Sequence, residues 1–114
     1  MELESELLER NVLKIILDGR LDIVGTNAIA KKLAALTETK CAGTIMDMGK
    51  VDFVASIGIR ALLSSAKACS AHGSKLILFN LQPLVKDVLK TCGVATLIPI
   101  FDDEQEALQF AHHI

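Results

Sequence analysis

Several residue types that mark particular functions are scarce or absent in this chain of 114 residues. It has no Trp or Tyr and only four Phe, so it lacks a set of aromatic rings on which nucleic-acid bases could stack. Its largest basic cluster is the pair Lys31-Lys32, and its net charge is −2. These values provide no positively charged surface for DNA or RNA, and nucleic-acid binding is not expected.

Long apolar runs are also missing. No stretch approaches the roughly 20 apolar residues that a membrane-spanning helix needs. The first residues, Met1-Glu2-Leu3-Glu4-Ser5-Glu6, are acidic where a secretory signal peptide is basic. We therefore expect a cytoplasmic protein without membrane insertion.

Cysteine is present only at Cys41, Cys69 and Cys92, an odd number at wide spacing. This usage indicates reduced thiols that fill small spaces in the core. No Cys-x-x-Cys pair occurs, and His112-His113 are adjacent at the end of the chain, so no zinc-ligand spacing is present. We expect neither a metal nor a cofactor.

What is present is enough apolar sequence for one core. Hydrophobic residues make up 51% of the chain and charged residues 23%, which indicates a folded protein. The length suits a single domain over residues 1–114.

The hydrophobic pattern predicts strands alternating with helices after an initial pair of strands. Strands are expected at 3–9, 11–17, 44–48, 75–79 and 97–101, and a turn at Asp18-Gly19. Helices are expected at 26–40, at 57–71, from Pro83 to about Cys92, and after Asp103. The order β-β-α-β-α-β-α-β-α predicts an α/β fold: a mixed sheet of about five strands, covered mainly on one face by about four helices.

The segment 51–63 is the most informative part of the chain. A buried approach leads to Ser56 and Gly58, after which the apolar rhythm of a helix begins. This order predicts that the Ser56 hydroxyl lies at a helix N-terminus, where backbone N–H groups lack intrahelical acceptors. The hydroxyl could cap the helix, which is worth about 1 kcal/mol. It could instead carry a phosphate favoured by the helix dipole.

Five segments, in order over nearly the whole chain, resemble the STAS domain family, in particular its single-domain anti-sigma-factor antagonists. They are Gly19-Arg20-Leu21-Asp22, the strand at 44–48 with its interior Asp47, Val51-Asp52-Phe53 before the Ser56 loop, 75–89 with Asn80, Gln82 and Pro83, and 102–107. The family loop usually has the sequence Asp-Ser-Ser/Thr-Gly-Leu-Gly. Ser56 falls on its phosphoacceptor position and Gly58 on its first Gly, whereas Ala55, Ile57 and Arg60 replace the Asp, the second hydroxyl residue and the second Gly.

The resemblance implies a STAS-like fold and a protein that switches partners. An antagonist of this kind binds an anti-sigma Ser/Thr kinase when it is unphosphorylated, is released by phosphorylation, here at Ser56, and is restored by a Ser phosphatase. A weak homodimer is left open. The resemblance and the helical spacing together imply a partner-binding set: Asp22, Ser56, Ile57, Gly58, Ile59, Arg60, Leu63, Ser64 and Lys67. Asp47, expected at the end of its strand, and Ala55 are expected to support the site.

Two other hypotheses are kept beside this one. The chain could be a STAS binding or scaffold subunit without phosphate chemistry, for example in a lipid-transport ATPase complex or a signalling assembly. An enzyme would need a base for Ser56; Asp22, Asp47 and Asp52 are available, but no His or Lys is placed by the sequence to activate the serine. We therefore expect no catalytic residues. Without the resemblance, Asp22 would be interpreted as a loop hydrogen-bonding residue, and Arg60, Ser64 and Lys67 as a solvated helix face.

Overall fold

The computed structural model describes residues 1–113, and its elements follow the expected order. The strands are β1 (Glu2–Leu8), β2 (Val12–Leu21), β3 (Gly43–Val54), β4 (Leu76–Phe79) and β5 (Ile100–Phe101). The helices are α1 (Ile23–Glu38), α2 (Ser56–Ala71), α3 (Pro83–Thr91) and α4 (Glu104–His112). Short 3-10 turns lie at Glu9–Asn11 and Val94–Thr96. The prediction of an α/β fold with five strands and four helices is confirmed.

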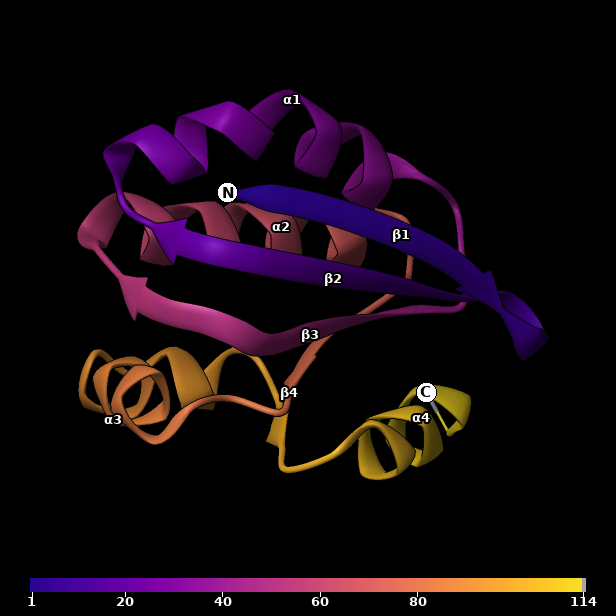
Figure 1. Ribbon diagram of the computed structural model, residues 1–114. Helices are drawn as coiled ribbons and strands as arrows, with labels where there is room; N and C mark the ends of the chain where they lie inside the picture. The colour runs from indigo at the N-terminus through magenta and orange to yellow at the C-terminus, as the bar shows by residue number, and fades with distance from the viewer. Residues whose placement is uncertain (114) are drawn as a thin grey trace.

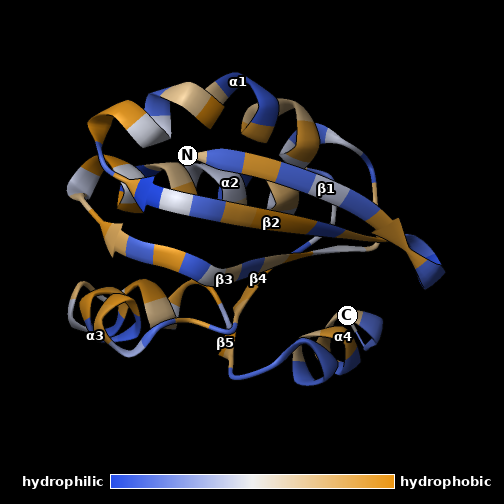
Figure 2. Cartoon of the chain, in the orientation of Figure 1, coloured by the Kyte–Doolittle hydropathy of each residue, from blue (hydrophilic) through white to orange (hydrophobic). Residues whose placement is uncertain are grey.

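The strands form one mixed sheet in their sequence order, β1-β2-β3-β4-β5. β1 pairs antiparallel with β2, and the remaining neighbours pair in parallel through the crossovers that α1, α2 and α3 supply. Figure 1 shows α1 and α2 in the upper part of the view, beside β1 and β2. The helices α3 and α4 lie below β3. Figure 2 shows hydrophilic and hydrophobic residues alternating along β1. The exposed Glu2, Glu4 and Glu6 on this edge strand discourage pairing with another chain.

The core divides into two clusters because side chains alternate between the two faces of a strand. Met46 and Leu78 belong to the larger cluster, which also contains the buried residues of α1, α2 and α3. Their neighbours Ile45 and Ile77 point to the opposite face, where Ala107 of α4 packs on them. Three helices thus contribute to one face of the sheet and α4 covers the other. An ion pair between Lys14 of β2 and Glu104 ties α4 to the sheet, and its hydrogen bond raises the pKa of the Lys14 ammonium group.

Two strands are longer than the sequence indicates. The turn expected at Asp18-Gly19 is wrong, because β2 continues through these residues to Leu21. Likewise β3 does not stop at Met48 but runs to Val54. The two extensions pair with each other in parallel up to Leu21↔Val54, with register shifts beside Gly19, whose φ is 130°. The pairing of the two extensions supplies the backbone hydrogen bonds that neither segment could make alone.

The helix ends follow local capping chemistry. Pro83 is the first residue of α3, and the Asp103 carboxylate caps α4 by accepting a hydrogen bond from the amide of Glu106. Gly73 and Gly93, at φ 79°, end the preceding helices as predicted. α1 begins three residues before the predicted Thr26, because Asp22 is its N-cap. The last strand is shorter than predicted: Pro99 has no N–H to donate, and only Ile100–Phe101 pair with β4.

Candidate functional site

Ser56 lies where the parallel strand β3 passes into α2. It is the first residue of the helix and directly follows the N-cap residue, Ala55. Its side chain is exposed. The prediction of an accessible hydroxyl at a helix start is confirmed. The capping alternative is wrong, because the N-cap position is occupied by Ala55, whose methyl group accepts no hydrogen bond. The first amides of α2 therefore have neither an intrahelical acceptor nor a side-chain cap.

Gly58 fixes the start of α2 against the end of β2. A Cβ atom at this position would lie 2.7 Å from the carbonyl oxygen of Leu21 and 2.8 Å from its Cβ, closer than real side chains approach. The amide of Ala55 donates to the same carbonyl oxygen over 2.9 Å. Gly58 belongs to the predicted partner-binding set, but it is buried. Its role in the structure is to pack α2 against β2. Its missing side chain allows the Ser56 turn to sit directly on β2.

Asp22 follows β2 as Ala55 follows β3, so the two residues stand at neighbouring strand ends. Its Oδ1 accepts a hydrogen bond of 2.8 Å from the amide of Gly25, which caps α1. This bond is the main cause that holds the pKa of Asp22 below its ordinary value, and Arg20, 3.4 Å from Oδ2, adds to the effect. The Arg20 guanidinium also stacks on the Phe53 ring, 4.3 Å from its centre. The loop hydrogen-bonding role expected of Asp22 from its residue type alone is confirmed.

The exposed side chains of the partner-binding set form one stripe along α2. Ser56, Arg60, Ser64 and Lys67 are exposed at helical spacing. Ile59 and Leu63 are half-buried and pack on the larger core cluster, and Ile57 is half-buried beside them. Within residues 1–113, Arg60 and Lys67 form no ion pair. We call Ser56, Arg60, Ser64 and Lys67 the α2 stripe.

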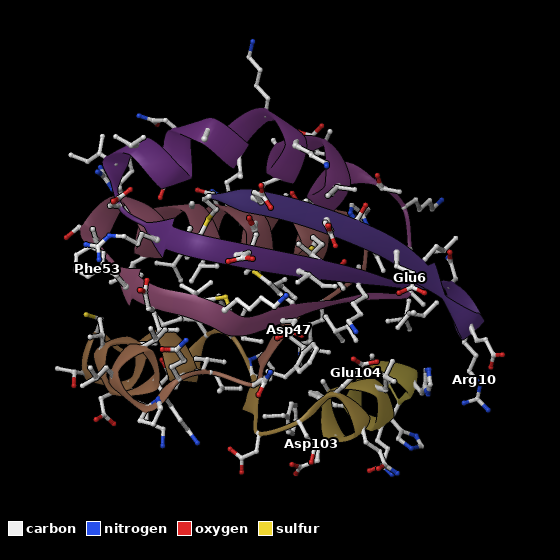
Figure 3. The ribbon with its side chains drawn as sticks, in the orientation of Figure 1. Glu6, Arg10, Asp47, Phe53, Asp103 and Glu104 are labelled. Atoms are coloured by element: carbon white, nitrogen blue, oxygen red, sulfur yellow. The ribbon has the colours of Figure 1, made fainter. Side chains whose placement is uncertain are left out.

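Asp47 is not brought to Ser56. The sequence places it at the end of its strand, but β3 continues for seven residues to Val54, so at about 3.3 Å per residue Asp47 lies roughly 23 Å before the strand end. Figure 3 shows Asp47 in the middle of the molecule and Phe53 far from it along β3. Its Oδ1 accepts hydrogen bonds from the amide of Gly49 at 2.9 Å and from Asn80 Nδ2 at 3.2 Å. Asp47 therefore orders the end of β4, and the proposed support of Ser56 by Asp47 is wrong.

Two neighbours of the site were missed by sequence reasoning. Ile23 and Val24, the first residues of α1, are 65% and 78% exposed. They lie beside Asp22 at the strand end that pairs with the Ser56 strand. The helix predicted from the sequence begins at Thr26, so Ile23 and Val24 lie outside it. The sequence signal for an earlier helix start is an Asp followed three residues later by a Gly, because an N-cap carboxylate accepts a hydrogen bond from the backbone amide at that spacing.

The sequence also predicted buried cysteines, no metal site and no membrane-spanning helix. Cys41 and Cys69 are buried as expected, and burial raises the pKa of the Cys69 thiol. Cys92 is exposed, which corrects the expectation for it. Across residues 1–113, no three His, Cys, Asp or Glu side chains gather as a metal site. In the same part of the chain, no helix combines the length and apolarity needed to cross a bilayer.

Comparisons with known proteins agree with this fold. The STAS domain model matches residues 8–107, and the chain belongs to the STAS domain family. An anti-sigma F factor antagonist of Paenibacillus polymyxa is 26% identical over 95% of this chain and 94% of its own length. The unphosphorylated anti-sigma factor antagonist SpoIIAA has the same fold, with a TM-score of 0.80, 23% identity and 99% and 98% of the two chains covered. Phosphorylated SpoIIAA from Bacillus matches with a TM-score of 0.70 and 22% identity over 95% and 97% of the two chains.

Proposed function

We propose that this protein is an anti-sigma-factor antagonist of a partner-switching pathway. In this proposal the unphosphorylated chain binds an anti-sigma Ser/Thr kinase in the cytoplasm, phosphorylation of Ser56 releases it, and a Ser phosphatase restores binding. The observation that carries the proposal is an exposed serine on the first position of α2, at the family's phosphoacceptor position. The names of the Paenibacillus relative and of SpoIIAA support the same assignment.

The site can hold a phosphate without a change of fold. A phosphoserine adds about −1.5 to −2 charges at neutral pH, and the positive end of the helix dipole favours such charge. Since Ala55 offers no cap, the first amides of α2 are available as donors to the phosphate oxygens. Arg60, one turn further along α2 and free of ion pairs within residues 1–113, adds a positive charge to the same face.

The same phosphate opposes binding of a protein over the α2 stripe. A doubly charged group covered by a partner must lose its water, which costs several kcal/mol unless a cation meets it. A loss of about 3 kcal/mol weakens binding by roughly two orders of magnitude. The release step therefore needs only the covalent modification, and this chain itself needs no catalytic residue.

Mapping of phosphosites on the protein isolated from its native cells tests the proposal. We expect phosphate on Ser56, and loss of the phosphorylated form in Ser56→Ala. Ser70→Ala is the matched control, because Ser70 is an exposed serine of α2 outside the partner-binding set and its loss should leave the phosphate on Ser56 unchanged. Absence of phosphate at Ser56, with the kinase partner expressed, would contradict the proposal.

The alternative is a STAS binding or scaffold subunit, for example of a lipid-transport ATPase complex or a signalling assembly. The observation that favours it is the replacement of the family's Asp and second hydroxyl residue by Ala55 and Ile57. In that case Ser56→Ala and Ser56→Asp would both keep the co-purifying partner, and the isolated protein would carry no phosphate. A weak homodimer stays a prediction, and sedimentation equilibrium tests it.

A further inference from the structure

The strand that leads to Ser56 projects beyond its neighbour. Pairing of β3 with β4 ends at Asp47↔Phe79, whereas its pairing with β2 continues to Leu21↔Val54. The last residues of β3 therefore have a neighbouring strand on one side only. On the other side lies α3, tied there by a hydrogen bond of 3.0 Å from Gln82 Nε2 to the carbonyl oxygen of Gly49.

An apolar groove lies between this projecting end and α3. It has a volume of about 340 Å³ and is lined by Asp52, Phe53 and Val54 of β3 and by Leu84, Val85, Asp87 and Val88 of α3. Leu84 is 76% exposed and Phe53 is 39% exposed, so large apolar side chains face solvent along the groove. Small-molecule sites bury most of their ligand. A groove whose apolar walls are exposed to solvent is better suited to the side chains of a protein segment.

The charged groups of the groove have one sign. Among residues 1–113, the ionisable side chains that line it are Asp52 and Asp87, both exposed. The basic residues of α3, Lys86 and Lys90, line a different hollow beside β5, and Lys86 is paired with Asp102 at 3.0 Å. Arg20, opposite Phe53 on the adjacent strand β2, stacks on the Phe53 ring and is paired with the Asp22 carboxylate at 3.4 Å, which offsets its charge. An occupant that places Lys or Arg beside its apolar side chains is complementary to these two carboxylates.

We propose that this β3–α3 groove is a second docking surface, which binds a protein segment with large apolar side chains flanked by Lys or Arg. The α2 stripe has the opposite charge, since its ionisable residues are Arg60 and Lys67. The two surfaces therefore take segments of different chemistry. A phosphate on Ser56 adds negative charge near the groove and does not repel a basic segment, so docking in the groove persists when the α2 stripe is blocked.

A random peptide library displayed on phage tests the groove with the intact protein. We expect enriched peptides that combine large apolar residues with Lys or Arg. Their affinity, measured by fluorescence anisotropy, should fall about tenfold or more in Leu84→Asp. Leu97→Asp is the matched control, because Leu97 is 68% exposed just after the 3-10 turn, outside the groove, and its substitution should leave the affinity unchanged. Since Leu84 is on the surface, both variants should keep the circular-dichroism spectrum of the parent.

Charge reversal and phosphomimicry separate this proposal from the proposed function. The double variant Asp52→Lys/Asp87→Lys should lose the basic peptides and gain acidic ones. Ser56→Asp should keep the basic peptides at equal or higher affinity, whatever it does to a kinase partner. Failure to enrich any peptide, enrichment of acidic peptides by the parent, equal binding by Leu84→Asp, or self-association that buries the groove would each overturn the proposal.

Discussion

The starts of α1 and α2 are two versions of the same junction, side by side at the ends of paired parallel strands. Each has an N-cap residue, two further residues and then a glycine: Asp22-Ile23-Val24-Gly25 and Ala55-Ser56-Ile57-Gly58. Both glycines press on the backbone of β2, and both first helical residues are exposed.

The two junctions differ in whether a side chain accepts hydrogen bonds from the first backbone amides of the helix. At α1 the Asp22 carboxylate accepts from the Gly25 amide, and the exposed first residue, Ile23, is inert. At α2 the cap position holds Ala55, and the exposed first residue, Ser56, can be modified. The comparison teaches that the strand ends decide where a side chain is presented, whereas the cap residue decides whether the junction is closed or open to added negative charge.

Both junctions have a glycine packed against the backbone of β2. Substitution of this glycine should have the largest effect on stability. A Cβ at Gly25 would lie 1.9 Å from the carbonyl oxygen of Arg20, a backbone atom that cannot move aside. We expect Gly25→Ala to lower the free energy of unfolding by about 3 kcal/mol, and Gly58→Ala by less. Urea denaturation measures both. Asn27→Ala, on the exposed side of α1, should be near neutral, and an unchanged midpoint for Gly25→Ala would show that β2 can withdraw from the helix.

Closing the open junction should have the next largest effect. Ala55→Asp puts a carboxylate where α2 has none, and we expect it to raise the free energy of unfolding by about 1 kcal/mol. The measurement is again the urea midpoint. Ala55→Leu provides the control, since it changes size without adding an acceptor. A gain of equal size in Ala55→Leu would mean that capping is not the cause.

Phosphate on Ser56 should have a smaller effect on stability. We expect the phosphorylated protein to be more stable by about 0.3–1 kcal/mol, because the charge lies at the positive end of α2. Thermal unfolding of the phosphorylated and unmodified forms measures the difference. In Ala55→Asp the gain should shrink, because the added carboxylate occupies the same amides and repels the phosphate. A destabilising phosphate would contradict the open-junction description.

The smallest expected effect is the pH dependence of the closed junction. The pKa of Asp22 is below its ordinary value of 3.8, so its contribution to stability is present above that value and is lost as the pH falls through the lower, folded-state pKa. Asp22→Asn, which keeps a capping oxygen without the charge, should approach the parent protein as the pH falls below about 4. Urea midpoints measured along a pH series test this, and a difference that stays constant into strong acid would exclude Asp22 as the titrating group.

Local chemistry made much of the candidate site predictable. The apolar run of β4, Pro83 at the start of α3 and the Asp103 cap of α4 depend on residues close together in the chain, and all were predicted. The position of Ser56 was predicted for the same reason, since a small exposed residue and a glycine preceded a helical pattern. Asp47 was misplaced because its distance from Ser56 depends on where β3 ends, which no local pattern showed.

By itself the sequence determined the order of the elements, the residues of the core and the presence of a serine at the mouth of a helix, because apolar periodicity and capping act over a few residues. Only the tertiary structure decided that β2 and β3 run on past Gly19 and Gly49. It also opened a groove beside α3. Those features depend on backbone hydrogen bonds between strands about thirty residues apart, and such pairing becomes favourable only after the chain has folded.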